Sequence, residues 1–93
     1  MNVLQTPLFR KAVKKLNNAQ KKCLDSAINQ LMKSPFSGDR KKGDLADIFV
    51  YKFKMGKQLA LLAYNYHEDT VTLTLLMLGS HENFYRDLKR HIH

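Results

Sequence analysis

The sequence predicts an α+β fold in two layers, with a helical hairpin packed on a small antiparallel sheet and followed by a short C-terminal helix. Two observations lead to this prediction. Apolar residues recur at helical spacing through the first third of the chain, and from residue 49 they alternate with polar residues as in half-buried strands. Each segment therefore has an apolar face, and two layers can bury these faces against each other. We expect residues 1–93 to form one domain.

Two helices are predicted after a short candidate strand at residues 2–6. Thr6-Pro7 is typical of a helix start, because threonine caps free N–H groups and proline fits the first helical position. Asn17-Asn18 separates the two helices, and Ser34-Pro35 ends the second. The two apolar stripes are Leu8, Phe9, Ala12, Val13 and Leu16, then Cys23, Leu24, Ala27, Ile28 and Leu31.

Three antiparallel strands are predicted between residues 49 and 78. Gly56 marks the turn into the second strand, at residues 59–66, and His67-Glu68-Asp69 marks the next turn. We expect the lysine and threonine face of the sheet to stay open, and Ser80 to cap a helix over residues 81–90. On the expected core face lie Phe49, Tyr51, Phe53 and Met55 of the first strand, and Val71, Leu73, Leu75 and Met77 of the third.

Positive charge is concentrated in the first two thirds of the chain. Residues 1–57 contain 13 Lys/Arg and 4 Asp/Glu, residues 58–93 contain 3 and 4, and the formal net charge is +8. This excess favours a polyanionic partner, which can be nucleic acid, the ribosome or an acidic protein, although a merely solvated surface has the same composition. The single cysteine, Cys23, excludes an internal disulfide and suits a reducing compartment. No apolar stretch has membrane-spanning length, so we expect a cytoplasmic protein with no membrane partner.

The third strand ends in Gly79-Ser80-His81, and Phe84-Tyr85 follows closely. A strand that delivers a histidine and aromatic residues at its exit is typical of the edge of a site, although a surface histidine after a strand gives the same pattern. Histidine titrates near neutral pH and can act as a general acid or base. The His and Cys spacings match no metal site, and there is no glycine-rich phosphate loop, so we predict neither metal nor cofactor.

The order of the predicted elements resembles that of the RelE/ParE superfamily of bacterial toxin-antitoxin toxins along essentially the whole chain. The likeness is firmest in the glycine-led connector before the sheet, in Tyr51-Lys52-Phe53-Lys54, in Leu61-Leu62-Ala63-Tyr64 and in Leu78-Gly79-Ser80-His81. The last of these is similar to the tail of YafQ-type mRNA interferases. The resemblance implies a toxin that acts as a ribosome-dependent mRNA endoribonuclease, inhibits translation and is held by a cognate acidic antitoxin.

The resemblance also assigns roles to individual residues. His81 would act as general acid or base, while Lys52 and Lys54 would hold phosphate or stabilise the transition state. Tyr85 would complete the catalytic set by stacking on a base or orienting a phosphate. A solvated sheet face is the alternative for the lysine pair, and a flexible loop is the alternative for the basic connector. The further residues expected to contact RNA are Arg40, Lys41, Lys42, Phe84 and Arg86.

One departure from the superfamily leaves the activity open. Its ribosome-dependent nucleases commonly carry an arginine on the middle strand, whereas the corresponding segment here, residues 58–62, has the sequence Gln-Leu-Ala-Leu-Leu and contains no cation. The alternative is a ParE-type toxin that inhibits DNA gyrase by binding and has no catalytic activity. A third interpretation is a basic RNA-binding module without toxicity.

Overall fold

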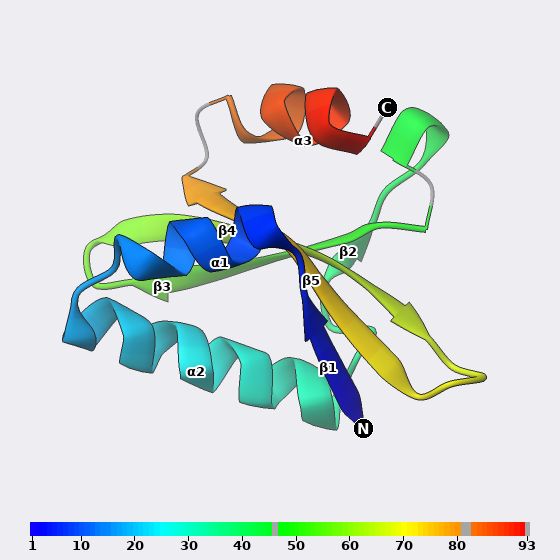
Figure 1. The fold of residues 1–93 in the computed structure, drawn as a ribbon, viewed down its shortest axis with the longest axis horizontal. Coiled ribbons are helices and arrows are strands. Elements are labelled where there is room, and N and C mark those ends of the chain that lie inside the picture. Colours follow the sequence, from blue (N-terminus) through cyan, green and yellow to red (C-terminus); the bar gives the residue numbers. More distant parts are fainter. Residues whose placement is uncertain (46, 81–82, 93) are drawn as a thin grey trace.

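The computed structural model describes residues 1–45, 47–80 and 83–92. Its five strands form one sheet in the order β1-β5-β4-β3-β2, with β1 parallel to β5 and all other neighbours antiparallel (Figure 1). This confirms the predicted α+β class. No helix in these ranges is long and apolar enough to cross a membrane. The elements in chain order are β1 (Asn2–Gln5), α1 (Pro7–Lys14), α2 (Asn18–Lys33), β2 (Asp39–Arg40), the 3-10 turn η1 (Gly43–Leu45), β3 (Phe49–Met55), β4 (Gln58–His67), β5 (Thr72–Ser80) and α3 (Phe84–Ile92).

Capping hydrogen bonds confirm both predicted helix starts. The N–H of Phe9 donates to the Thr6 hydroxyl at 3.1 Å, in the first turn of α1. At the start of α2, the side chains of Asn17 and Gln20 each accept from the other's backbone N–H, at 2.8 and 2.9 Å. The Thr6 hydroxyl also donates to the carbonyl of Leu76 at 2.7 Å, which fixes the start of α1 to β5.

One face of the sheet is buried under α1 and α2. Phe49 of β3 belongs to this core while Val50 belongs to the opposite one, as the predicted alternation requires. Leu31 of α2 is 0% exposed, whereas Ile28 and Cys23 on the same helix are only partly buried. The buried residues on this side are Phe9, Leu24, Leu31, Phe49, Met55, Ala60, Leu62, Tyr64, Leu73 and Leu75.

A β-bulge changes the direction of the side chains along β5. Tyr64 of β4 pairs with Leu75, but the preceding Ala63 pairs with Met77, so Leu76 is an extra residue in β5. Leu75 faces the helical hairpin as predicted, whereas Met77 lies in the core on the opposite face. The predicted alternation is therefore wrong beyond Leu75, because one inserted residue reverses a period of two. It is also wrong at Val71, which precedes β5 and is 45% exposed.

The helix α3 packs on the face of the sheet opposite α2 (Figure 1). This face was expected to be open, but α3 covers part of it. Ser80 ends β5 and does not cap α3, which begins only at Phe84, after Asn83 turns the chain with a φ of 64°. The buried cluster on this side contains Leu45, Ile48, Val50, Leu61, Ala63, Met77, Phe84 and Leu88.

Tyr64 fixes the connector between α2 and β3 to the sheet. Its hydroxyl donates to the carbonyl of Pro35 at 2.7 Å and accepts from the N–H of Gly38 at 2.9 Å. A Cβ at Gly38 would lie 2.8 Å from the hydroxyl oxygen and 3.1 Å from the backbone of Val50, so this approach requires glycine. Burial raises the pKa of the Tyr64 phenol, and the Gly38 hydrogen bond partly opposes that rise. The edge strand β2, which was not predicted, begins immediately afterwards at Asp39.

Candidate nucleic-acid interface

Lys52 and Lys54 lie on the side of the sheet that carries α3. Both are exposed residues of β3, and they alternate with the residues of that strand that pack toward α2. Lys52 pairs across the strands with Leu61, and Lys54 pairs with Leu59. In the described ranges neither lysine forms an ion pair. Their charges are therefore available to an anion from solvent.

The register of the sheet brings Lys52 near the exit of β5. Leu61 of β4 pairs with Lys52 on one side and with Gly79 on the other. Two strand spacings, about 10 Å, separate the backbone of Lys52 from that of Gly79. Ser80, the last residue of β5, is exposed. His81 follows it and lies outside the described residues, so the lysine face can be related to the strand exit but not to the histidine side chain itself.

The two aromatic residues of α3 have different surroundings. Phe84 is 1% exposed, and a Cβ at Gly79 would lie 3.1 Å from its ring. This burial argues against the RNA contact expected of Phe84, because no face of its ring is open to a base. Tyr85 is half-buried, and its ring meets that of Phe84 edge-on with 5.5 Å between centroids. Arg86 is exposed, with its Nε atom 4.0 Å from the Asp87 carboxylate.

The basic cluster at residues 40–42 does not form one patch. The Arg40 guanidinium lies 3.1 Å from the Asp47 carboxylate and 5.8 Å from the centroid of the Phe49 ring, which belongs to the core under α2. The Lys41 ammonium lies 5.0 Å from the centroid of the Tyr85 ring on α3. The side chains of Arg40 and Lys41 therefore lie on opposite sides of the sheet, as those of adjacent residues in an extended segment do.

Lys42 is exposed. Within the described residues it forms no ion pair. The connector thus offers Lys41, but not Arg40, to a ligand on the α3 side.

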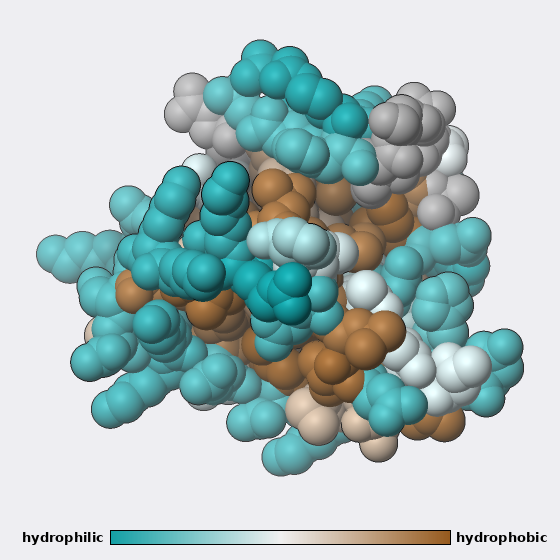
Figure 2. Space-filling view, viewed as in Figure 1, coloured by the Kyte–Doolittle hydropathy of each residue, from teal (hydrophilic) through white to brown (hydrophobic). Residues whose placement is uncertain are grey.

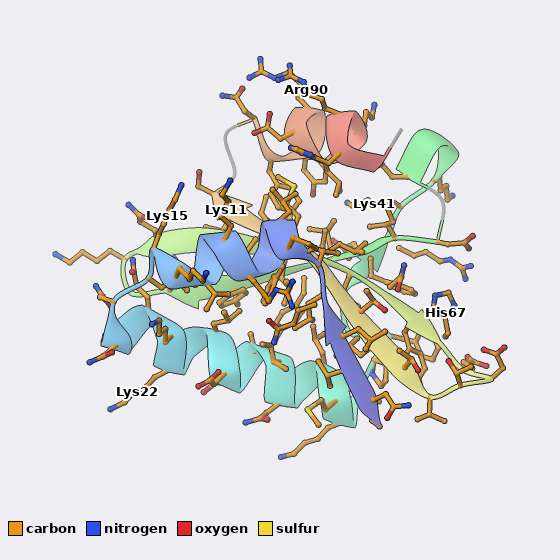
Figure 3. All side chains as sticks on the ribbon, in the orientation of Figure 1. Lys11, Lys15, Lys22, Lys41, His67 and Arg90 are labelled. Carbon is orange, nitrogen blue, oxygen red and sulfur yellow. The ribbon has the colours of Figure 1, made fainter. Side chains whose placement is uncertain are left out.

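A groove of 310 Å³, which was not predicted from the sequence, adjoins the exit of β5. Lys15, just after α1, lines it together with Leu59 of β4 and with Gly79 and Ser80 of β5. Figure 3 shows Lys11 and Lys15 projecting from the α1 segment toward the side on which α3 lies, and Figure 2 shows hydrophilic side chains over α1. Within the first predicted helix, Arg10, Lys11, Lys14 and Lys15 lie mostly away from the apolar stripe, and this pattern was a signal for a basic surface. Their position beside β5 depends on tertiary packing, which the stripe does not specify.

His67 and His91 are the two histidines within the described residues. His67 ends β4 and pairs with Thr72, at the opposite end of the β4–β5 hairpin from Ser80 (Figure 3). His91 is an exposed residue in the last turn of α3. Across the described part of the chain, no three His, Cys, Asp or Glu side chains gather closely enough to hold a metal ion.

The fold and the site define a small, basic α+β protein whose exposed lysines share one side of a sheet with a strand exit. The sequence model of the ParE-like toxins of type II bacterial toxin-antitoxin systems matches residues 3–89. The chain belongs to this family and is the toxin of a type II toxin-antitoxin system. This membership favours the two toxin interpretations over a non-toxic RNA-binding module. No curated protein is similar enough in sequence to count as a relative.

Solved structures of toxins share the fold at low sequence identity. A chain of the intact Escherichia coli RelBE toxin-antitoxin complex superposes with a TM-score of 0.70 at 18% identity, over 87% of this chain and 96% of that one. The YoeB/ParE toxin from Agrobacterium tumefaciens superposes with a TM-score of 0.71 at 15% identity, over 87% of this chain and 99% of that one. A chain of the RelBE2 toxin-antitoxin complex from Mycobacterium tuberculosis superposes with a TM-score of 0.67 at 19% identity, over 85% of this chain and 95% of that one. These likenesses support the RelE/ParE fold predicted from the sequence.

Proposed function

We propose that this toxin is a ribosome-dependent mRNA endonuclease that inhibits translation. The observation that supports it best is the register of the sheet, in which Lys52, Leu61 and Gly79 form one row across three strands. This row brings an exposed cation to the strand exit that continues into His81. Cleavage of RNA by its own 2′-hydroxyl requires a proton acceptor, a proton donor and cations near the phosphoryl oxygens. A histidine and a lysine pair are residue types that can meet these requirements.

In the proposed mechanism each residue has a separate role. His81 transfers a proton, either from the attacking 2′-hydroxyl or to the leaving 5′-oxygen. Lys52 and Lys54 bind the scissile phosphate and stabilise the charge that grows on it. Tyr85 stacks on a neighbouring base with the exposed part of its ring, and Lys41 beside it binds the adjoining phosphate. Lys42 and Arg86 contribute general attraction for RNA. Two of the residues expected to contact RNA have no role in this mechanism. Arg40 is paired with Asp47 on the other side of the sheet, and Phe84 is buried.

The ribosome supplies what this site lacks. One histidine and two flexible lysines do not fix the reacting atoms of a free RNA strand in line, and misplacement of the reacting atoms reduces the rate steeply. A message held in the decoding site is already extended and oriented. The formal net charge of +8 favours docking on ribosomal RNA. We therefore expect cleavage during translation and little cleavage of naked RNA.

Inhibition of DNA gyrase without catalysis is the second candidate function. Two observations favour it: the matching family is described as ParE-like, and the start of β4 has no cation at residues 58–62. The superfamily's ribosome-dependent nucleases commonly have an arginine on this strand. Under this alternative the lysine pair and His81 would have no catalytic use. Substituting His81 therefore separates the two candidates.

The proposed partner is a cognate acidic antitoxin. The E. coli and M. tuberculosis structures that resemble this chain are toxin-antitoxin complexes. An acidic segment that covers the lysine side of the sheet would neutralise the toxin's charge and exclude RNA at the same time. The product of the neighbouring reading frame should therefore co-purify with the toxin when both are expressed from the native operon. A toxin that is equally lethal with and without that product would contradict this pairing.

Mapping of RNA 5′ ends after induced expression tests the nuclease proposal in cells. We expect growth arrest accompanied by new 5′ ends inside coding regions, and we expect the supercoiling of a reporter plasmid to be unchanged. Growth arrest with intact messages and relaxed plasmid would contradict the nuclease proposal and favour gyrase inhibition.

A further inference from the structure

We infer that the groove between α1 and the exit of β5 binds one nucleotide of single-stranded RNA, with the adjoining phosphates on Lys11 and Lys15. The inference rests on the proposed nuclease function and extends its substrate site beyond the predicted residues. The binding experiment below does not measure cleavage, so the RNA-binding role of the groove and the nuclease activity can each be refuted without the other.

The lining of the groove suits a nucleobase. Leu16, Met55 and Leu78 provide apolar walls, and Leu59 is 37% exposed on the β4 side. Gln58 adds a side-chain amide, which can donate to and accept from the edge of a base. A planar, partly polar ring can bury its faces against such walls while its edge makes hydrogen bonds. The groove volume of 310 Å³ is at the lower end of the range for small-molecule sites, about 300–1,000 Å³.

The α1 side of the groove attracts anions: Lys15 lines the groove, and Lys11 lies one helical turn before Lys15 on α1. No acidic residue precedes Asp25, and the first 24 residues carry six Lys/Arg. Lys11 and Lys15 are exposed, and no described residue forms an ion pair with either. They are one helical turn apart, about 6 Å along the axis, which is close to the separation of neighbouring phosphates in an extended strand. Figure 3 shows both side chains projecting to the same side.

The groove lies between the core under α1 and α2, to which its walls Leu16, Met55 and Leu78 belong, and the lysine face of the sheet, which it meets at Leu59 and Gly79. Leu59 lines the groove and pairs across the strands with Lys54, while Gly79 lines the groove and shares its row with Lys52. An RNA strand can therefore pass from the two lysines of β3, across the exit of β5, to the lysines at α1. An acidic peptide would satisfy the lysines alone, whereas a nucleotide uses both the charges and the apolar groove.

The test is the binding of a short single-stranded 2′-O-methyl RNA, which cannot be cleaved through its 2′-oxygen, measured by fluorescence anisotropy over a range of salt concentrations. The charge variant is Lys11→Gln with Lys15→Gln. Its matched control is Lys22→Gln with Lys33→Gln, which removes the same charge from exposed residues of α2. The groove variant is Ala12→Leu, which fills the groove from its α1 side and keeps a good helix former. Circular dichroism verifies that each variant is folded.

We expect the charge variant to bind roughly tenfold more weakly than the wild type. The plot of log association constant against log salt concentration should become less steep by about 1.4, which corresponds to the loss of two phosphate contacts on a single strand. The control should keep the slope of the wild-type protein. The groove variant should weaken binding several-fold without changing the slope, because it removes no charge. Equal losses in the charge variant and its control would overturn the inference, and so would unchanged binding by the groove variant. A polyglutamate peptide that displaces the RNA from the wild-type protein but not from the charge variant would instead assign this surface to an acidic protein.

Discussion

The ammonium group of Lys41 lies 5.0 Å from the centroid of the Tyr85 ring. The backbone N–H of Lys41 donates to the carbonyl of Ile48 at 2.8 Å, which fixes the connector where its side chain reaches α3. A cation over an aromatic face contributes about 0.5–1 kcal/mol at exposed positions. Through this contact, the basic connector and the aromatic residue of α3 form one surface instead of two separate ones.

Truncation of Tyr85 should reduce toxicity more than loss of its hydroxyl does. Tyr85→Ala removes a stacking face that contributes about 1–3 kcal/mol per base in single-strand recognition, and it also removes the support for Lys41. Tyr85→Phe keeps the ring, so it should retain most of the activity. Growth arrest after induction, together with thermal melts of both variants, measures this. A folded Tyr85→Ala protein as toxic as the wild type would exclude Tyr85 from the site.

Substitution of both Lys52 and Lys54 by Gln should abolish toxicity and leave stability nearly unchanged, because both side chains are exposed and unpaired within the described ranges. Leu31→Ala should do the opposite. Leu31 is fully buried, and truncation of such a residue costs about 2–5 kcal/mol. Ile28 is less buried, so Ile28→Ala should destabilise the protein less than Leu31→Ala. A lysine double variant that unfolds, or that arrests growth normally, would contradict the assignment.

His81→Ala should relieve growth arrest if His81 transfers a proton. The matched control is His67→Ala, because His67 is an exposed histidine that ends β4 at the opposite end of the β4–β5 hairpin from Ser80 (Figure 3). That control should remain toxic. Circular dichroism of both proteins distinguishes lost chemistry from lost folding. Full growth arrest by a folded His81→Ala protein would remove the proton-transfer role.

Tyr64→Phe should destabilise the fold at neutral pH by about 1–3 kcal/mol, because it leaves the Gly38 N–H without its partner. The folded-state pKa of Tyr64 is raised above 10.0, so the unfolded chain loses this proton first as pH rises. The stability that the buried phenol contributes is complete below pH 10.0 and is lost as pH increases through the folded-state pKa. The gap in unfolding free energy between the wild type and Tyr64→Phe should therefore narrow above pH 10.0.

Denaturant unfolding at several pH values measures that gap. Tyr66→Phe is the control, since the Tyr66 hydroxyl forms no hydrogen bond within the described part of the chain. If the difference in unfolding free energy between the wild type and Tyr64→Phe stays constant into the alkaline range, the stabilisation does not depend on the protonated Tyr64 phenol, and the prediction is wrong.

Local patterns were sufficient to predict most of the fold. Caps and periodicity specify both helices of the hairpin and the alternation along β3, because these features depend on neighbours a few residues away. The bulge at Leu76 was not predictable in this way, since it is defined by the pairing of β5 with β4. The late start of α3 and its position over the sheet likewise depend on Phe84 packing against Gly79. Without these long-range contacts, the sequence pattern of residues 70–78 predicts one uninterrupted alternating strand.

The candidate site was predictable only in part. The exposed lysines of β3 follow from strand alternation alone. The division between Arg40 and Lys41 depends on the extended connector, which Tyr64 fixes from a distant strand. The groove beside Lys15 exists because α1 packs along β5, a contact between residues far apart in the sequence.

Cleavage of a labelled message in a reconstituted translation reaction tests the central claim most directly. Purified toxin is added to the same mRNA with and without translating ribosomes, and gyrase supercoiling is measured in parallel at the same toxin concentration. We predict new 5′ ends within the coding region only when ribosomes translate, no such ends with His81→Ala, and unaffected supercoiling. An intact message in the presence of translating ribosomes, together with inhibited supercoiling, would contradict the account.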